Sequence, residues 1–306
     1  MTLEQELFGV RFQNPVLLAA GTCGFGEELA EVVDLERLGG LVTKSVTREP
    51  RAGNPAPRVA EFHAGMLNSI GLANPGVEAV RRDKLPWLRD HVRRAQVFVS
   101  VAGHDPEDFA AIVARLDDCD GFVGFEINLS CPNDTARGAL PFALDPEALV
   151  VVVERVRART QRPLWAKLAP NAPDPGASAR LAVEAGADGV TMVNTLPGLQ
   201  FDLDTLAPRL GAGPGGMSGP ALLPVGVHAV WRARTQVSVP IVGAGGVATA
   251  SDAAQYLLAG ASLVQVGTAS FADPASALRV VDGLARLGAA KGFSHIDALI
   301  GAGRTP

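Results

Sequence analysis

The sequence predicts a (β/α)8 barrel, a TIM barrel of the α/β class, formed as a single domain by residues 1–306. Three observations carry this prediction. Eight short apolar runs are each followed by Gly, Asn or Ser, segments with helical spacing separate them, and this fold accommodates 306 residues in one domain. Near-continuous apolar strands that alternate with helices form a parallel sheet covered on its outer face, and eight such units close into a barrel.

The alternative is an open doubly wound sheet. Its first strand would lead into a GxGxxG turn, and the sequence GTCGFGEE at residues 21–28 does not form one convincingly. We therefore expect the closed barrel.

The expected strands are short runs rich in Val, Leu and Ile. They cover residues 15–22, 40–45, 97–103, 124–130, 163–170, 189–195, 240–246 and 263–269.

The segments between them have the spacing of apolar residues that is typical of helices, and several begin with Asp or Ser before Pro or Ala, which is good N-cap chemistry. The expected helices cover residues 27–38, 105–116, 145–160, 174–185, 222–235, 251–259 and 273–287. Two connections, residues 46–76 and 196–220, are long for a simple barrel. Long ordered loops in a compact domain are usually functional, so we expect both to lie over the carboxyl-terminal face of the barrel.

Composition limits the class of protein. Apolar residues make up 47% of the chain and charged residues 19%, which is enough apolar surface for a sizeable core. The net charge of -5 and the absence of a Lys/Arg block argue against nucleic-acid binding. The amino terminus is acidic and the apolar runs are too short for a membrane span, so we expect a cytoplasmic protein that binds no membrane.

Three cysteines, Cys23, Cys119 and Cys131, stand far apart without a CxxC pair. This spacing excludes a disulfide framework and an all-cysteine metal or iron-sulfur site within the chain, and we expect no metal.

Polar residues gather where the expected strands end, and in a barrel the carboxyl ends of the strands face the site. Lys44 and Lys167 lie in or at the end of buried strands, where an ammonium group needs an acceptor that a ligand can supply. The other polar strand-end residues are Asn128, Ser130, Asn194 and Thr195.

The last two strands end in glycine-rich turns, GAGG at residues 243–246 and VGT at residues 266–268. Consecutive glycines let backbone N–H groups approach a phosphate closely, and a helix that begins near Ser251 would add its positive end. The loops after strands seven and eight are the usual phosphate site of this fold, although glycines also serve tight turns.

Cys131 follows an apolar strand directly and begins a segment rich in Pro, Gly and polar residues. A thiol at the edge of a site has a free pKa of about 8.5, which suits proton transfer after modest adjustment. From chain position alone, a catalytic and a structural role stay equally open. Cys23 and Cys119 are expected to be structural.

Several motifs together resemble one family. NLSCPN (128–133), MLNSIGLANPG (66–76), VNT (193–195), GGMSGPALLP (215–224) and GAGG strongly resemble the flavin-dependent dihydroorotate dehydrogenases of pyrimidine biosynthesis. The similarity runs from about Phe8 to the carboxyl-terminal region, and NSIGLANPG with SCPN is its most specific part.

The resemblance implies that the single domain binds FMN at the barrel mouth, with (S)-dihydroorotate stacked on the flavin. Cys131 is then the catalytic base. The implied FMN contacts are Ala20, Gly21, Lys44, Ser45, Asn128, Lys167, Val193, Gly219, Gly245, Gly246, Gly267 and Thr268. The implied substrate contacts are Lys44, Asn68, Ser69, Ile70, Gly71, Leu72, Asn128, Asn194 and Thr195.

The resemblance also bears on the electron acceptor. The cysteine and the lack of an amino-terminal helical extension disfavour the membrane-docking, quinone-reducing members. The chain looks more like the NAD-linked type, which works with a subunit carrying FAD and a [2Fe-2S] cluster, than like the fumarate-reducing homodimers. A homodimer or a heterotetramer with such a subunit is the implied assembly.

Two departures and three alternatives remain. Ala20 stands where relatives commonly have Ser, and Ser100 stands where Asn is usual. The alternatives are an FMN barrel that acts on another dihydropyrimidine, one that resembles the dihydrouridine synthases, and a flavin- or phosphate-binding barrel without turnover. The missing basic RNA-binding extension argues against the second, and Cys131 against the third.

Overall fold

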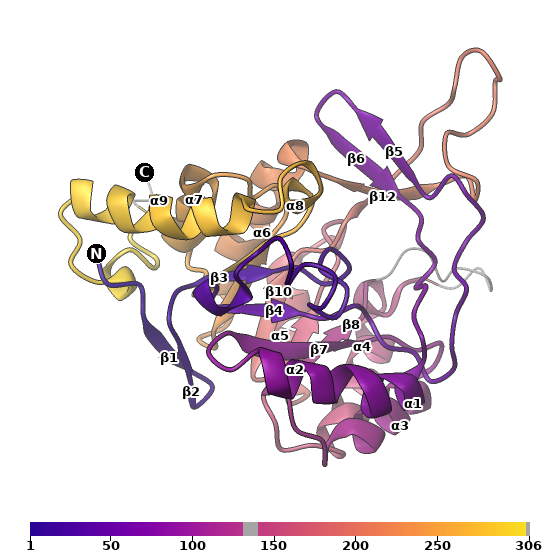
Figure 1. Ribbon diagram of the computed structural model, residues 1–306, viewed down its shortest axis with the longest axis horizontal. Coiled ribbons are helices and arrows are strands. Elements are labelled where there is room, and N and C mark those ends of the chain that lie inside the picture. Colours follow the sequence, from indigo (N-terminus) through magenta and orange to yellow (C-terminus); the bar gives the residue numbers. More distant parts are fainter. Residues whose placement is uncertain (131–139, 304–306) are drawn as a thin grey trace.

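Eight parallel strands close into a barrel in the computed structural model, which describes residues 1–130 and 140–303 (Figure 1). Around the barrel the strands run in the order β10-β13-β14-β3-β4-β7-β8-β9, so each strand lies beside the one that precedes it in the sequence. The predicted (β/α)8 barrel is confirmed. The strands are β3 (Val16–Leu18), β4 (Gly40–Val42), β7 (Gln96–Val101), β8 (Gly124–Asn128), β9 (Leu164–Lys167), β10 (Gly189–Met192), β13 (Ile241–Ala244) and β14 (Leu263–Val266).

Helices cover the outside of the barrel, which explains why the strands are apolar on both faces. Asp105, Asp145 and Asp174 cap three of these helices by accepting hydrogen bonds from backbone N–H groups of the first turn, as the sequence predicts. The helices are α3 (Pro106–Leu116), α4 (Pro146–Arg157), α5 (Pro175–Glu184), α6 (Leu223–Arg234), α7 (Ala250–Ala259), α8 (Ala269–Ala272) and α9 (Ser276–Ala290).

The helix expected over residues 27–38 is wrong. The structure has turns there and only a 3-10 helix, Leu35–Arg37. The Asp34 side chain accepts a hydrogen bond from Glu36 N–H, a local bond that competes with a continuous helix, and it follows two β-branched valines.

A helical run between β4 and β7 was not predicted. It consists of α1 (Val77–Ala79), a π-helical segment (Val80–Lys84) and α2 (Leu85–His91). Val77, Val80, Leu85 and Leu88 on this run are buried, so it packs on the barrel as the other helices do.

An amino-terminal hairpin, β1 (Gln5–Leu7) and β2 (Val10–Phe12), closes the end of the barrel opposite the carboxyl ends of the strands (Figure 1). Phe12 belongs to the cluster of buried apolar residues that fills this end, together with Phe98 and Trp165, whose rings stack with centroids 3.6 Å apart. Side chains therefore plug one end of the barrel, and a ligand has access from the other.

The two long connections are not plain loops. They contain β5 (Val59–Phe62), β6 (Gly65–Asn68), β11 (Leu196–Gly198) and β12 (Gly215–Ser218), which form an antiparallel sheet in the order β11-β12-β6-β5. We call these four strands the mouth sheet. Figure 1 shows β5, β6 and β12 standing apart from the barrel. Within the described residues, none of the helices combines the length and apolar character needed to span a bilayer.

Candidate active site

A cleft opens where the barrel strands end, between them and the mouth sheet. It encloses about 1120 Å³, including the part open to solvent. Small-molecule sites commonly enclose 300–1,000 Å³, so the cleft has room for a large ligand. The sequence-predicted residues that line it are Ala20, Gly21, Lys44, Ser45, Asn68, Ile70, Leu72, Asn128, Lys167, Val193, Asn194, Thr195, Gly245, Gly246, Gly267 and Thr268.

Three sequence-predicted residues do not line the cleft. Ser69 is buried and its hydroxyl accepts a hydrogen bond from Asn54 Nδ2 at 2.8 Å. Gly71 has a φ of 70°, and a Cβ there would overlap the Asn54 side chain. Gly219 has a φ of 106°, and a Cβ there would come within 2.6 Å of Gly65 Cα. These three residues therefore pack against other parts of the chain next to the cleft and do not face it.

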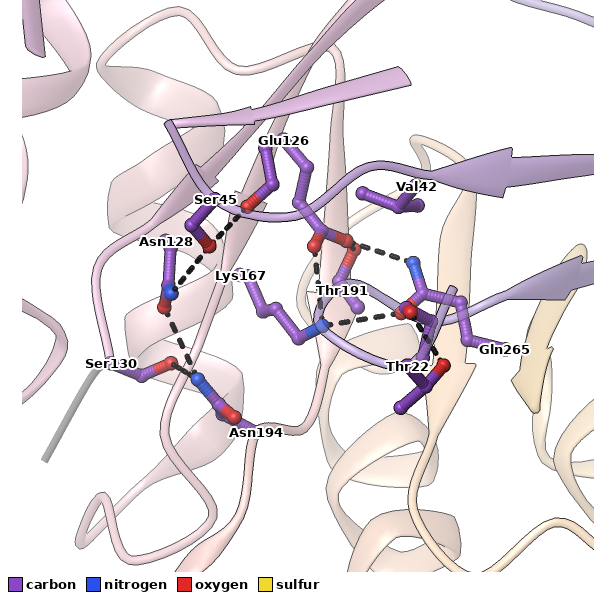
Figure 2. Close-up of polar contacts among 12 residues, drawn as sticks. Thr22, Val42, Ser45, Glu126, Asn128, Ser130, Lys167, Thr191, Asn194 and Gln265 are labelled. Atoms are coloured by element: carbon purple, nitrogen blue, oxygen red, sulfur yellow. Dashed lines mark hydrogen bonds and ion pairs between the residues drawn. The ribbon is translucent and has the colours of Figure 1, made fainter. Parts of the chain in front are cut away.

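Three amide side chains meet at the mouth of the cleft. Asn194 Nδ2 donates to Asn128 Oδ1 at 3.2 Å and to Ser130 Oγ at 3.0 Å, and Asn128 Nδ2 donates to Ser45 Oγ at 3.3 Å (Figure 2). Asn68 enters from β6 of the mouth sheet. Amides at fixed positions present both donors and acceptors, which suits a ligand with amide edges of its own.

Ser100, one of the two departures from the family pattern, lies behind this group. It is fully buried, and its hydroxyl shares a hydrogen bond of 2.8 Å with Ser45 Oγ. Ser100 therefore supports Ser45 and does not line the cleft, whereas Ala20, the other departure, does line it.

The floor of the cleft contains a buried ion pair. Lys167 Nζ lies 3.2 Å from Glu126 Oε1 and 3.2 Å from Gln265 Oε1 (Figure 2). Lys167 is 5% exposed and Glu126 is 0% exposed. The acceptor that a lysine in a buried strand needs is thus partly supplied by the protein.

The glycine turns after β13 and β14 form one side of the cleft. Gly245 and Gly246 have φ values of 118° and 74°, a conformation that favours glycine. Within the described residues, no protein acceptor pairs with the backbone N–H groups of Gly246, Gly267 and Thr268. Donors that converge in this way form a site for an anionic group such as a phosphate.

The helix after β13 contributes less to this site than expected. It begins at Ala250, and Thr249 and Asp252 form a capping box at its first turn. Asp252 Oδ2 accepts hydrogen bonds from Ala248 N at 3.1 Å and Thr249 N at 2.8 Å. A carboxylate already occupies the positive end of this helix, so the glycine turns carry the anion site.

Comparison with known proteins identifies the family. A sequence model described as dihydroorotate dehydrogenase matches residues 2–287. The chain belongs to the dihydroorotate dehydrogenase family. Members are flavin-dependent oxidoreductases of pyrimidine biosynthesis, and the chain is an enzyme of this class.

Relatives named for two electron acceptors match the chain almost equally well. The NAD(+)-linked dihydroorotate dehydrogenase B catalytic subunit of Geotalea uraniireducens is 42% identical, over 98% of this chain and 97% of its own. The B catalytic subunit of Desulforudis audaxviator is 45% identical, over 96% and 95%. A putative dihydroorotate dehydrogenase A (fumarate) of Solibacter usitatus is 45% identical, over 98% and 97%.

A solved structure supports the fold. The dihydroorotate dehydrogenase of Eimeria tenella, crystallised with ferulenol, superimposes with a TM-score of 0.82 at 24% identity, over 98% of this chain and 88% of its own.

The residues present fit a flavin mononucleotide. The N–H groups of the glycine turns supply donors for a phosphate, and the cleft continues from there to Lys167 at the floor. A Cβ at Gly267 would meet nothing closer than the Ala19 methyl at 3.4 Å, so the side-chain-free surface here is open to a ligand. No group of three or more His, Cys, Asp or Glu side chains that could hold a metal occurs among the described residues.

The cysteines differ in their surroundings. Cys131, the proposed base, lies outside the described residues. Burial raises the pKa of the Cys23 thiol to about 12, so Cys23 is unreactive and structural, as expected. Cys119 is half-buried beside Arg81, and burial raises its pKa as well.

Sequence reasoning missed several residues at the cleft. Glu126 in FEIN and Gln265 in LVQV carried a usable signal, because each is a polar residue within an otherwise apolar strand. Met66, Ser218 and Phe271, which also line the cleft, carried none.

Proposed function

We propose that this chain oxidises (S)-dihydroorotate to orotate with a bound FMN, in the synthesis of UMP. The observation that carries the proposal is the convergence of three asparagines and two lysines, from five separate strand ends, on one cleft beside an anion-binding glycine turn. We propose residues 1–306 as one FMN-binding domain.

The cleft offers the groups that the substrate requires. Asn68, Asn128 and Asn194 present amides to the two amide edges of a dihydropyrimidine ring. Lys44 brings positive charge to the same region, which suits the carboxylate of dihydroorotate. A dihydropyrimidine without a carboxylate would not need this lysine in the same way.

FMN, when bound, supplies an acceptor for the hydride that leaves C6 of the substrate. The protein must then take the proton from C5, on the face of the ring away from the flavin. Cys131 is the proposed base. In the sequence it directly follows Ser130, whose hydroxyl accepts a hydrogen bond from Asn194 Nδ2 at 3.0 Å at the mouth of the cleft.

The proposal has two forms, which differ in the electron acceptor. In the form that we favour, electrons pass to NAD through a partner subunit with FAD and a [2Fe-2S] cluster. Relatives named as B-type catalytic subunits support it. The relative named as a putative fumarate enzyme supports the second form, a homodimer that passes electrons to fumarate.

The substrate is tested by mixing the purified, FMN-loaded chain with dihydroorotate in the absence of oxygen. Bleaching of the flavin absorbance is expected, and orotate should compete with the substrate. A flavin that is bleached by uracil-type dihydropyrimidines and not by dihydroorotate would refute the proposal.

The acceptor is tested in a steady-state screen of fumarate against NAD, with and without a candidate FAD/[2Fe-2S] subunit. Turnover with NAD only when the subunit is present supports the NAD-linked heterotetramer. Turnover of the isolated chain with fumarate supports the homodimeric alternative.

A further inference from the structure

Glu126 lies at the centre of a polar group inside the barrel that sequence reasoning did not assign. Besides Lys167 at 3.2 Å, it accepts hydrogen bonds from Thr191 Oγ1 at 2.9 Å and from Gln265 Nε2 at 2.8 Å. Its carboxylate has no exposed surface, and the donors come from β9, β10 and β14 (Figure 2). A buried carboxylate with three donors is held in one place.

Lys167 is the member of this group that reaches the cleft. An ammonium has three N–H donors. Among the described residues, Glu126 and Gln265 take two of them, both at 3.2 Å, and Lys167 lines the floor of the cleft. The third donor remains for a ligand there, and the two protein acceptors fix the direction in which it points.

The charge of Glu126 opposes that of Lys167 at the cleft. A flavin in the cleft takes up two electrons and one proton on reduction and becomes an anion. Lys167 favours this anion, whereas Glu126, the other charge of the pair, disfavours it. In a buried site neither charge is screened strongly by water, so both act on the ligand.

We propose that Glu126 is a positioning residue that aims Lys167 at the flavin and limits the charge it presents, and thereby holds the reduction potential of the bound FMN below the value that Lys167 alone would set. The inference rests on the FMN binding of the proposed function but not on the identity of the substrate.

The test is the midpoint potential of bound FMN, measured by slow enzymatic reduction against a reference dye. Glu126→Gln keeps the size of the side chain. Its oxygen can still accept from Lys167 and its amide can donate to the Thr191 hydroxyl, whereas Gln265 Nε2 loses its acceptor. We expect the equilibrium for flavin reduction to shift at least tenfold toward the reduced form, about 30 mV for a two-electron couple. A smaller rise of the midpoint potential, or a fall, would overturn the inference.

A control variant separates charge from structure. Thr191→Val removes a donor but keeps both charges and the Glu126 side chain, so it should leave the equilibrium within threefold of the parent. A tenfold rise in Thr191→Val would show that disturbance of the group, not loss of charge, shifts the potential, and would also overturn the inference.

A double variant covers the case in which Glu126→Gln fails to fold. Breaking a buried pair leaves an unpaired charge, whereas removing both charges is well tolerated. Lys167→Met should favour the oxidised flavin at least tenfold, because it removes the charge that favours the reduced anion. Adding Glu126→Gln removes the opposing charge as well and should shift the equilibrium back toward the reduced flavin at least threefold. No such shift on adding Glu126→Gln contradicts the inference.

These outcomes differ from failure of the proposed function. If the folded parent binds no FMN, the proposed function fails. If it binds FMN and the potentials do not respond to Glu126, only the role of Glu126 is refuted.

Discussion

Tyr256→Phe tests whether a buried tyrosine on α7 maintains the glycine turn of the anion site. Tyr256 is the only tyrosine of the chain and is fully buried. Its hydroxyl lies 2.9 Å from Ala244 O and 2.7 Å from Gly245 O, and burial raises its pKa, so the hydroxyl stays a donor at any working pH. A Cβ at Gly226 or Gly243 would overlap its side chain, so two glycines leave room for it.

Both carbonyl oxygens lose the hydrogen bond from the Tyr256 hydroxyl in Tyr256→Phe, but only one of them keeps another donor. Ala244 O also accepts a hydrogen bond from Val193 N at 2.9 Å, whereas no other donor reaches Gly245 O within the described residues. The part-buried Gly245 O therefore loses its hydrogen bond in the variant, which costs about 0.5–1.5 kcal/mol. A chain of this length has an unfolding entropy of about 0.6 kcal/mol/K, so Tm should fall by about 1–2 °C.

The local effect is measured by titrating FMN into the apoprotein and following its fluorescence. If about 1 kcal/mol of the loss falls on the turn, the Kd for FMN should rise about fivefold. Ile112→Val, on α3 and away from the cleft, is the control. It should cost about 0.5–1.5 kcal/mol and leave the Kd for FMN unchanged. A Tyr256→Phe protein that loses stability but binds FMN within twofold of the parent would refute the reasoning.

Three further predictions concern single residues. Cys131→Ala should bind FMN normally but slow flavin reduction by dihydroorotate about 100-fold in stopped-flow traces, and an unchanged rate would contradict its role as base. The Cys23 thiol has a pKa of about 12 in the folded protein and about 8.5 in the unfolded chain, so the unfolded chain is favoured as the pH rises above 8.5. Between pH 7 and 10 the free energy of unfolding of the parent should therefore fall by about 2 kcal/mol more than that of Cys23→Ala. Equal falls for the two proteins in urea titrations would exclude this linkage. Asn74→Ala, which breaks bonds to Thr47, Leu72 and Gly76, should raise the KM for dihydroorotate severalfold with FMN affinity unchanged, whereas equal changes in both would point to general loss of structure.

The barrel could be predicted from the sequence because its signals are local. A strand that is buried on both faces must be apolar along its length, and all eight such runs form barrel strands. Three helices could be predicted in the same local way, because each begins after an N-cap aspartate: Asp105, Asp145 and Asp174. The helix predicted for residues 27–38 was wrong because the apolar spacing there is helical, but the Asp34 side chain bonds to Glu36 N–H and forms a local turn.

The mouth sheet could not be predicted for the opposite reason. Its register pairs Asn68 of β6 with Gly216 of β12, 148 residues along the chain, and no local pattern records such a pairing. The candidate site divides in the same way. Strand-end residues such as Lys44 and Asn128 follow from the barrel rule, whereas Met66 and Ser218 reach the cleft only through the mouth sheet.

The mouth sheet has a further consequence for how such a molecule can diversify. The glycine turns that we propose for the cofactor phosphate follow strands of the barrel, whereas Asn68, Ile70 and Leu72 lie on or beside the mouth sheet. Evolution can therefore remodel the part of the cavity that selects among small molecules, or thread new residues into residues 199–214, while the redox half keeps its geometry. Substrate specificity can therefore change in such a scaffold without any change in the residues that bind the cofactor.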